Sequence, residues 1–219
     1  MIKHPAKYND KFIPIFAELL SSSKNILDPF AGTGKIGLIK NHGFVGRIFC
    51  NEIEKEWGNS SIYPVDEWHF CDSANMDWAI AEYFDAICTS PTYGNRMADH
   101  FNSKDLSKRI TYKHYLGKDL NKNNTGRMQW GAKYKEKHLE IYKECKRVLK
   151  LNGIFILNVS DHIRKGKVVK VSKWHEEILL NIGMTKIKEI LIKTERMKFG
   201  ENYSERVKNE VIYVFKKGA

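Results

Sequence analysis

The stretch NILDPFAGTGKIG, residues 25–37, constrains the fold more than any other part of the 219-residue chain. Ile26 and Leu27 read as the end of a buried strand, and an acidic residue, three glycines and a helical run follow. A strand, a glycine turn and a helix in this order present a helix N-terminus to a nucleotide-like ligand in α/β sheets. Glu52 lies about twenty residues further on, the spacing at which a second carboxylate reaches ribose hydroxyls. We therefore expect a nucleotide-type site at one edge of an α/β sheet.

A phosphate-binding P-loop is the first alternative for such a loop, and it requires the pattern Gly-x-x-x-x-Gly-Lys-Ser/Thr. Here Ile36 follows Lys35, and Pro29 stands where the first glycine of that pattern belongs. The sequence therefore excludes a P-loop.

A dinucleotide-binding loop is the second alternative. The spacing of Gly32, Gly34 and Gly37 fits its fingerprint, so the glycines alone leave a nicotinamide-dependent enzyme open. Asp28 at the tip of the expected strand favours a different ligand, because a carboxylate disfavours a pyrophosphate and suits a cationic ammonium.

The heptapeptide DPFAGTG, residues 28–34, resembles motif I of the S-adenosylmethionine-dependent nucleic-acid methyltransferases. S-adenosylmethionine carries an ammonium, a ribose and an adenine, so it suits the two acidic positions. The resemblance implies this molecule as the cofactor. The cofactor-binding residues that it implies are Asp28, Phe30, Ala31, Gly32, Thr33, Gly34 and Glu52.

Two further cofactor contacts follow from the same resemblance. HPAKYND, residues 4–10, loosely resembles motif X and places Tyr8 near the methionine end of the cofactor. These residues equally suit the start of a helix that covers one face of the sheet, with Asp10 as its N-cap and Pro14 in its first turn. Asp72 follows the third expected strand, where the family reads the adenine amino group; it can instead cap a helix predicted over residues 74–83.

Residues 84–88 are apolar and predict a strand, and Ser90, Pro91, Thr92 and Tyr93 leave its C-terminal end. In a doubly wound sheet that end shares an edge with the glycine loop. The tetrapeptide resembles motif IV, (Asp/Asn/Ser)-Pro-Pro-Tyr, of methyltransferases that act on exocyclic amino groups. Thr92 replaces the second proline and removes its stiffness.

The chemistry of an amino group explains this tetrapeptide. The amino nitrogen of cytosine or adenine is a poor nucleophile, because its lone pair is delocalised into the ring. Two acceptors for its hydrogens, Ser90 Oγ and the Pro91 carbonyl, favour a pyramidal nitrogen that can attack a sulfonium methyl group. Tyr93 is expected to stack on the base after it flips out of the helix.

Residues 96–137 combine many lysines and arginines with interleaved aromatic residues. Such a segment suits phosphate contacts and base stacking, and it is long for a connection in a compact domain. We expect a substrate-binding insertion, although a merely solvated loop fits the same composition. The substrate-binding residues expected in or next to it are Asn95, Arg96, Arg109 and Trp130.

The α/β alternation resumes after this segment. Periodicity predicts helices over 136–149 and 171–182 and strands over 154–159, 187–193 and 211–215, the last two as an antiparallel pair. Asp161 and His162 follow the strand at 154–159 and should open on the same crevice. They suit lining the base pocket or accepting a proton or, equally, a helix cap and a surface position.

The charge and composition of the chain indicate what kind of partner it binds and where it is located. The chain has 37 basic against 26 acidic residues, a net charge of +11, which favours a polyanionic partner. Its four cysteines form no Cys-x-x-Cys pair and predict reduced core thiols, so no metal site is expected. The first ten residues contain no apolar signal core, and no run is long enough to span a membrane, so we expect a cytoplasmic protein.

These observations predict a single α/β domain over residues 1–219, a Rossmann-like class I methyltransferase with a mostly parallel seven-stranded sheet and helices on both faces. The expected activity is methyl transfer from S-adenosylmethionine to the exocyclic amino group of a DNA base, with cytosine N4 favoured over adenine N6. An RNA methyltransferase acting on guanine or adenine remains open. So does a catalytically inactive nucleic-acid-binding module, which Thr92 suggests.

Overall fold

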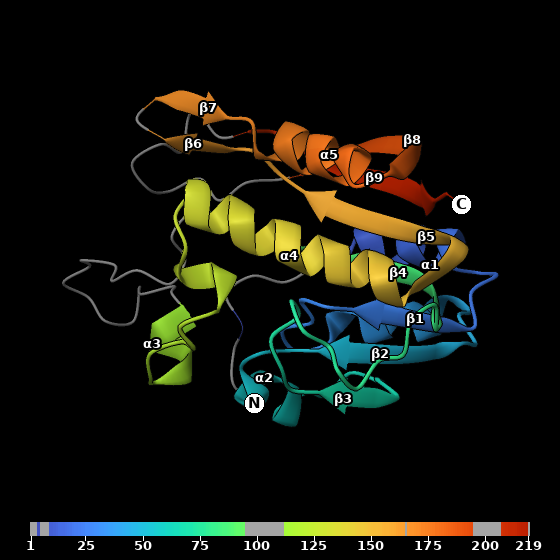
Figure 1. Ribbon diagram of the computed structural model, residues 1–219. Helices are drawn as coiled ribbons and strands as arrows, with labels where there is room; N and C mark the ends of the chain where they lie inside the picture. The colour runs from blue at the N-terminus through green and yellow to red at the C-terminus, as the bar shows by residue number, and fades with distance from the viewer. Residues whose placement is uncertain (1–3, 5–8, 95–111, 165, 195–206, 219) are drawn as a thin grey trace.

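The computed structural model describes residue 4 and residues 9–94, 112–164, 166–194 and 207–218 (Figure 1). The strands of the main sheet are β1 (Asn25–Asp28), β2 (Arg47–Asn51), β3 (Glu67–His69), β4 (Phe84–Thr89), β5 (Leu149–Val159), β8 (Met184–Lys193) and β9 (Asn209–Lys217). A separate hairpin consists of β6 (His162–Arg164) and β7 (Lys167–Val169). The helices are α1 (Phe12–Leu19), η1 (Lys35–His42), α2 (Lys55–Asn59), α3 (Tyr112–Leu116), η3 (Thr125–Arg127), α4 (Ala132–Val148) and α5 (Val171–Asn181).

Seven strands form one sheet in the order β3-β2-β1-β4-β5-β9-β8. The pairs from β3 through β5 are parallel, whereas β9 is antiparallel to both of its neighbours, β5 and β8. The order reverses at β1, between β2 and β4, and ligands of open α/β sheets bind at such a switch point. The predicted mostly parallel sheet with an antiparallel last strand is therefore confirmed.

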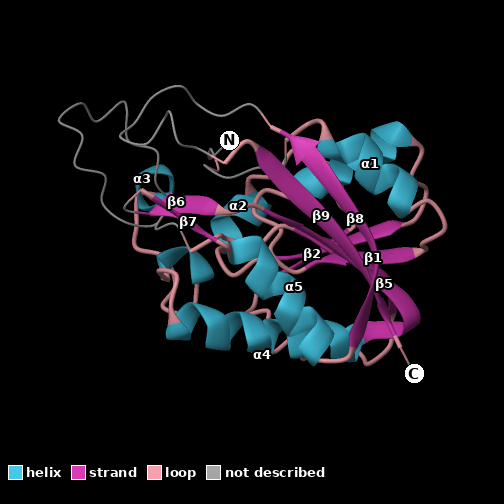
Figure 2. Cartoon of the chain, turned by 90° about the horizontal axis from the view of Figure 1, so that it is seen from above, coloured by secondary structure: helices cyan, strands magenta, loops and turns pink. Residues whose placement is uncertain are grey.

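The two faces of the sheet bury two separate cores, because successive strand residues point to opposite sides. In β1, Leu27 packs with α4 and α5, while Ile26 packs with α1 and η1. In the same way Ile87 and Ala86 of β4 belong to opposite faces. Figure 2 shows α4 and α5 on one side of the sheet and α1 on the other. Helices on both faces are thus confirmed.

The helix predicted over residues 74–83 is wrong, because these residues form turns. Side chains of α4 take up their backbone groups instead: Glu144 accepts from the Met76 amide at 2.9 Å, and Arg147 donates to the Ala79 carbonyl at 2.9 Å. Glu82 has a φ of 56°, a left-handed conformation that ends any helical path.

Two smaller corrections concern the first helices. The N-cap position of α1 is Lys11 rather than Asp10, whose carboxylate pairs with Lys35 Nζ at 2.5 Å. Pro14 does fall in the first turn of α1, as predicted. The helical run after the glycine loop is a 3-10 helix, η1.

The segment 96–137 is only partly a loop. Residues 95–111 lie outside the described part, and residues 112–137 contain α3, η3 and the first turns of α4. α4 begins at Ala132, four residues before the predicted start, so the basic residues at its N-terminus are helical.

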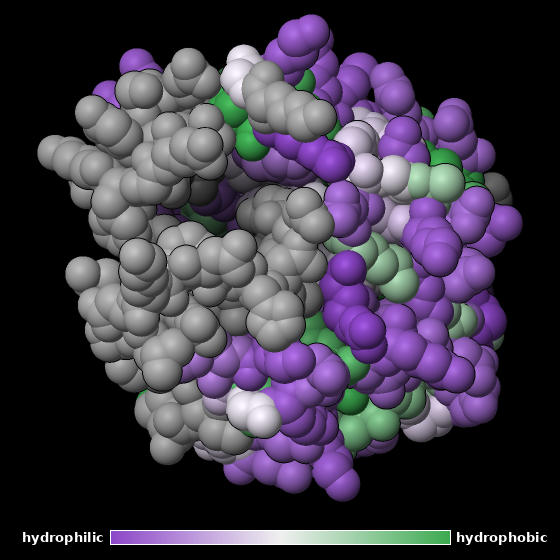
Figure 3. All heavy atoms as spheres, turned by 90° about the vertical axis from the view of Figure 1, so that its left-hand side faces the viewer, coloured by the Kyte–Doolittle hydropathy of each residue, from purple (hydrophilic) through white to green (hydrophobic). Residues whose placement is uncertain are grey.

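The carboxyl ends of β2 and β5 point toward the side on which α3 and the β6–β7 hairpin lie (Figure 1). Seen from this side, the residues around the undescribed segments are mostly hydrophilic (Figure 3). In the ranges that the structure describes, no helix is long and apolar enough to cross a membrane.

Candidate active site

The glycine loop leaves β1 in a conformation that two glycines permit. Gly32 and Gly34 have φ values of 55° and 74°, in the left-handed region that favours glycine. A Cβ at Gly34 would lie 2.6 Å from the Trp68 ring, and one at Gly32 would lie 3.1 Å from the imidazole of His4. The loop is therefore packed tightly between Trp68 of β3 and the imidazole of His4.

Asp28 is fully buried at the end of β1. Its Oδ1 atom accepts hydrogen bonds from the Phe30 amide at 3.1 Å and from the Thr89 hydroxyl at 2.6 Å. Thr89 is the last residue of β4, directly before the tetrapeptide, so one carboxylate connects the glycine loop to the expected catalytic motif.

Glu52 lies after β2 and holds the same loop from the other side. Its Oε2 atom accepts from the Gly32 amide at 2.7 Å, and its Oε1 atom accepts from the Glu54 amide at 3.0 Å. Burial raises the pKa of Glu52 to about 8, and the two amide donors offset only part of this effect. The carboxyl thus sits where ionisation is unfavourable without further donors.

Asn51 and Ser73 connect the loops that follow β1, β2 and β3, and no motif in the sequence indicated either residue. The side-chain amide of Asn51 donates to Ser73 Oγ at 2.8 Å, and the Ser73 hydroxyl donates to the Pro29 carbonyl at 2.5 Å. Both side chains are buried, so they fix the relative positions of the three loops.

Asp72 lies at the same edge of the sheet, and its carboxylate accepts hydrogen bonds from three groups of the protein. It accepts from the Ala74 amide at 3.0 Å, from the Asn123 amide group at 2.9 Å and from Lys137 Nζ at 2.7 Å. Asp72 therefore caps a turn rather than the predicted helix, and it anchors α4 and the residues before η3. Its expected adenine contact stays a prediction.

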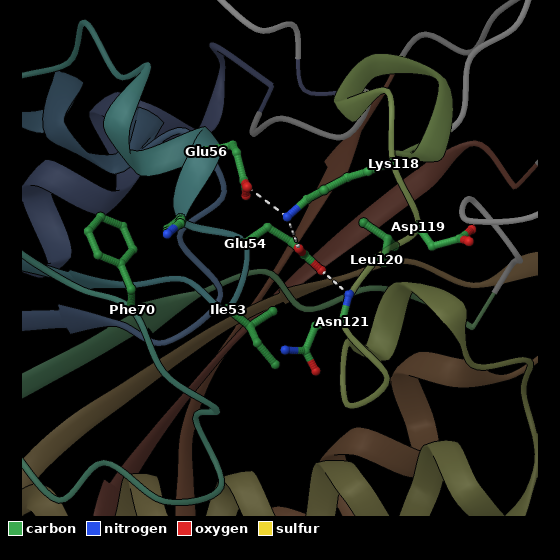
Figure 4. Close-up of a pocket in the computed structure, with 9 residues that line it drawn as sticks. Ile53, Glu54, Glu56, Phe70, Lys118, Asp119, Leu120 and Asn121 are labelled. Atoms are coloured by element: carbon green, nitrogen blue, oxygen red, sulfur yellow. Dashed lines mark hydrogen bonds and ion pairs between the residues drawn. The ribbon is translucent and has the colours of Figure 1, made fainter.

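A cavity of about 250 Å³ lies beside Glu54, at the ends of β2 and β3 (Figure 4). Glu54 is buried, and its Oε1 atom accepts from the Asn121 amide at 2.6 Å and from the Asn124 side chain at 3.0 Å. Lys118 Nζ pairs with Glu56 at 2.6 Å on the same wall. Ile53 and Phe70 supply apolar lining. A ring system fits a space of this size better than a whole drug-sized ligand, whose pockets are roughly 300–1,000 Å³.

The tetrapeptide follows β4 at the same edge of the sheet. Ser90 Oγ lies 3.0 Å from the Tyr93 hydroxyl, and Pro91 is buried. Thr92 donates its hydroxyl hydrogen to Thr125 Oγ1 at 2.9 Å, and its carbonyl accepts from the hydroxyl of Tyr134. The motif is therefore held by η3 and α4, two elements that come later in the chain.

Asp161 and His162 differ in their surroundings. Asp161 Oδ1 accepts from the amide and the hydroxyl of Ser172, at 2.8 and 2.7 Å, so it caps the start of α5. His162 is hydrogen-bonded to the backbone of Tyr93, and its buried Nδ1 atom has no partner among the described residues. Burial and the nearby Arg164 lower its pKa. His162, unlike Asp161, lies against the tetrapeptide.

Trp130 also approaches the tetrapeptide, since its amide donates to the carbonyl of Gly94 at 3.0 Å. Its ring lies 5.7 Å from that of Trp174, and Lys135 Nζ lies 5.0 Å from the Trp130 centroid. These residues form an aromatic and basic surface next to the β6–β7 hairpin, where Arg164 donates to Gln129 at 3.2 Å.

Several basic residues expected to contact phosphate are paired within the protein. Lys113 pairs with Asp119, Lys118 with Glu56, Lys137 with Asp72, and Arg127 donates to the Leu120 carbonyl. Lys122 and Lys133 are exposed. The expected residues Tyr8, Asn95, Arg96 and Arg109 lie outside the described residues.

The chain belongs to the N6/N4 DNA methylase family, which its residues 84–219 match. It is therefore a methyltransferase. The family match begins at β4 and covers the tetrapeptide.

Solved structures share the fold at low identity. The N-methyltransferase NodS from Bradyrhizobium japonicum superimposes with a TM-score of 0.55 at 10% identity, over 96% of this chain and 97% of that one. A putative RNA methyltransferase from Pyrococcus horikoshii gives 0.55 at 11% identity, over 95% and 82%. An S-adenosylmethionine-dependent methyltransferase from Methanosarcina mazei gives 0.58 at 13%, over 94% and 97%. They show a class I methyltransferase fold. No curated protein matches the sequence significantly.

The residues at the glycine loop fit S-adenosylmethionine, the cofactor that the family implies. Asp28 and Glu52 supply buried acceptors, which suit an ammonium and ribose hydroxyls. The apolar side chains of Ile53 and Phe70 line the cavity beyond Glu52, where a ring system fits.

Proposed function

We propose that this protein transfers a methyl group from S-adenosylmethionine to the exocyclic amino nitrogen of a DNA base, with cytosine N4 favoured over adenine N6. The observation that carries the proposal is the connection from Asp28 through Thr89 to the tetrapeptide. It brings the loop that suits the cofactor and the motif that suits an amino group to one edge of the sheet.

The cofactor supplies an electrophilic methyl group when it is bound. Asp28 would hold its ammonium end and Glu52 its ribose hydroxyls. The ring-sized cavity would take the adenine, whose faces would pack on Ile53 and Phe70 while the polar side chains of the lining face its edge.

Ser90 would accept a hydrogen of the target amino group, and this role sets a requirement for its own hydroxyl proton. The lone pairs of Ser90 Oγ are free for the base only if its O–H points elsewhere. The Tyr93 hydroxyl, 3.0 Å away, is an acceptor for that proton. Ser90 as donor to Tyr93 would therefore leave its oxygen aimed at the amino group, beside the Pro91 carbonyl.

His162 would line the base pocket opposite the sheet. Its unpartnered Nδ1 atom is buried, and a buried polar atom is costly unless a ligand satisfies it. With its pKa lowered, the ring is neutral at pH 7 and can hydrogen-bond the edge of a base.

The nucleic acid would reach this pocket over the surface of Trp130, Lys133, Lys135 and the β6–β7 hairpin. Lysine side chains beside two indole rings that meet edge to face suit phosphates and unstacked bases. The test is a methyl-transfer assay with labelled cofactor on DNA and on RNA, followed by mass spectrometry of the digested product. Labelled N4-methylcytosine in DNA supports the proposal, and label confined to RNA overturns the choice of DNA.

A further inference from the structure

Thr92 stands where the related tetrapeptide has its second proline, and the structure restrains it in another way. Its hydroxyl is bonded to Thr125 at 2.9 Å and its carbonyl to Tyr134. A proline restrains the backbone through its ring, by fixing φ and limiting the residue before it. Here two side chains from later elements contact the same residue.

Tyr134 is itself held in a buried chain of hydrogen bonds. Its hydroxyl lies 2.8 Å from His175 Nε2, and His175 Nδ1 lies 2.7 Å from the hydroxyl of Tyr142. All three side chains are fully buried between α4 and α5. The imidazole of His138 stacks between two rings. Its centroid lies 3.9 Å from that of Tyr134 and 5.5 Å from that of Phe30 in the glycine loop.

The hydrogens of this chain have a single consistent arrangement. The Thr92 carbonyl can only accept, so Tyr134 donates to it and must accept from His175 Nε2–H. Burial together with His138 lowers the pKa of His175 well below its usual value, so its imidazole is neutral. With the proton on Nε2, Nδ1 of the neutral ring carries a lone pair and accepts from Tyr142. In this arrangement the hydroxyl hydrogen of Tyr134 points at the Thr92 carbonyl.

We propose that Tyr134, oriented by His175 and Tyr142, is a positioning residue that replaces the restraint of the missing proline and holds the Ser90–Tyr93 backbone in its active geometry. Tyr134 does not touch the substrate. Its contribution reaches the reaction through the Thr92 carbonyl, one residue from the Pro91 carbonyl that would accept an amino hydrogen. The effect of Tyr134 on methyl transfer rests on the proposed function, whereas its effect on the Thr92 backbone does not.

The experiment compares Tyr134→Phe, the double variant Tyr134→Phe/Thr92→Pro, and Tyr213→Phe as a matched control. Tyr213 is another buried tyrosine, on β9, which β5 separates from the strand that leads to the tetrapeptide. Amide hydrogen exchange of the 84–94 peptide is measured by mass spectrometry without substrate. We expect exchange in that peptide to accelerate roughly tenfold in Tyr134→Phe, the effect of losing one hydrogen bond to a buried group. We expect it to return near the parent rate in the double variant and to stay unchanged in Tyr213→Phe.

Equal exchange in Tyr134→Phe and the parent would overturn the proposal, and so would a double variant that exchanges as fast as Tyr134→Phe. If Tyr134→Phe does not fold, Thr125→Val removes the second bond to Thr92, and it should also accelerate exchange in the same peptide. The kcat for methyl transfer should fall in Tyr134→Phe with the cofactor KM unchanged and recover with the proline. If the parent protein transfers no methyl group, the proposed function is wrong. The role of Tyr134 in restraining Thr92 is still tested, because amide exchange is measured without substrate.

Discussion

The Oε2 atom of Glu52 accepts a hydrogen bond from the Gly32 amide at 2.7 Å, so the carboxyl after β2 holds the glycine loop after β1. Burial raises the pKa of Glu52 to about 8, which means that the free protein carries this group largely neutral at pH 7. Ribose hydroxyls bonded to Glu52 would favour the ionised form. Binding then releases a proton, and affinity falls as the pH drops below the pKa of the free protein.

Methylthioadenosine has the ribose and adenine of the cofactor but no titrating amine. We predict that, as the pH is raised toward 8, its affinity increases by up to about tenfold per pH unit, and that above pH 8 the affinity levels off. Glu52→Gln keeps the shape but cannot ionise. It should bind roughly 1–3 kcal/mol more weakly at high pH and show no such pH dependence. Calorimetry from pH 6 upward measures both. A parent profile as flat as that of the variant contradicts the role of Glu52.

Much of this edge of the sheet was predictable, because the signals are local. Asp28, Gly32, Gly34 and the tetrapeptide follow apolar runs that read as strands, and parallel strands bring their carboxyl ends together. The parallel pairing of β1 with β2 and β4 confirms that these segments meet at one edge of the sheet, whereas the roles of the individual residues stay predictions.

The residues that the sequence did not indicate act across long separations. Tyr134 contacts a residue 42 positions earlier, and Asn124 contacts Glu54 across 70 positions. Tyr134 and Asn124 look like ordinary helix and turn residues, and only the packing of α4 and η3 on the sheet gives them a role. The wrong helix over 74–83 has the same origin, since Glu144 and Arg147 compete for its backbone groups.

The Ser90–Tyr93 hydrogen bond leads to a second prediction. Ser90→Ala should lower kcat on the order of a hundredfold while the cofactor dissociation constant changes little, because the lost contact acts at the transition state. Tyr93→Phe keeps the stacking ring but removes the acceptor for the Ser90 proton, so it should cause a smaller loss. Single-turnover kinetics with matched cofactor titrations separate the two effects. A Ser90→Ala variant with parental kcat would remove Ser90 from the reaction.

The third prediction concerns the exposed cations near the tetrapeptide. Replacing Lys133, Arg164 and Lys167 by glutamine should reduce the slope of log affinity against log salt by about 0.9 for each lost duplex phosphate contact. The control replaces Lys143, Lys188 and Lys216, which are exposed residues of α4, β8 and β9, and changes the net charge equally. Fluorescence anisotropy with labelled duplex DNA measures the slopes. Equal slopes for the two triple variants would show that the surface near the tetrapeptide is not the contact surface.

The fourth prediction separates Asp161 from His162. Because Asp161 caps α5 through Ser172, Asp161→Ala should destabilise the protein by about 0.5–2 kcal/mol. Its kcat, measured at a temperature where the variant is folded, should stay close to that of the parent. Denaturant unfolding and the transfer assay together decide the point. A folded Asp161→Ala variant with a large loss of kcat would place Asp161 in the base pocket after all.

The identity of the methylated base decides whether this protein methylates the amino group of cytosine in DNA. Purified protein, labelled S-adenosylmethionine and separate DNA and RNA substrates are incubated, digested to nucleosides and analysed by mass spectrometry, with Ser90→Ala as the matched control. We predict labelled N4-methylcytosine from DNA with the parent protein and a strongly reduced yield with the Ser90→Ala variant. Labelled N6-methyladenine in DNA would overturn the cytosine assignment alone. Label only in RNA, or no transfer to any amino group, would contradict the proposed function.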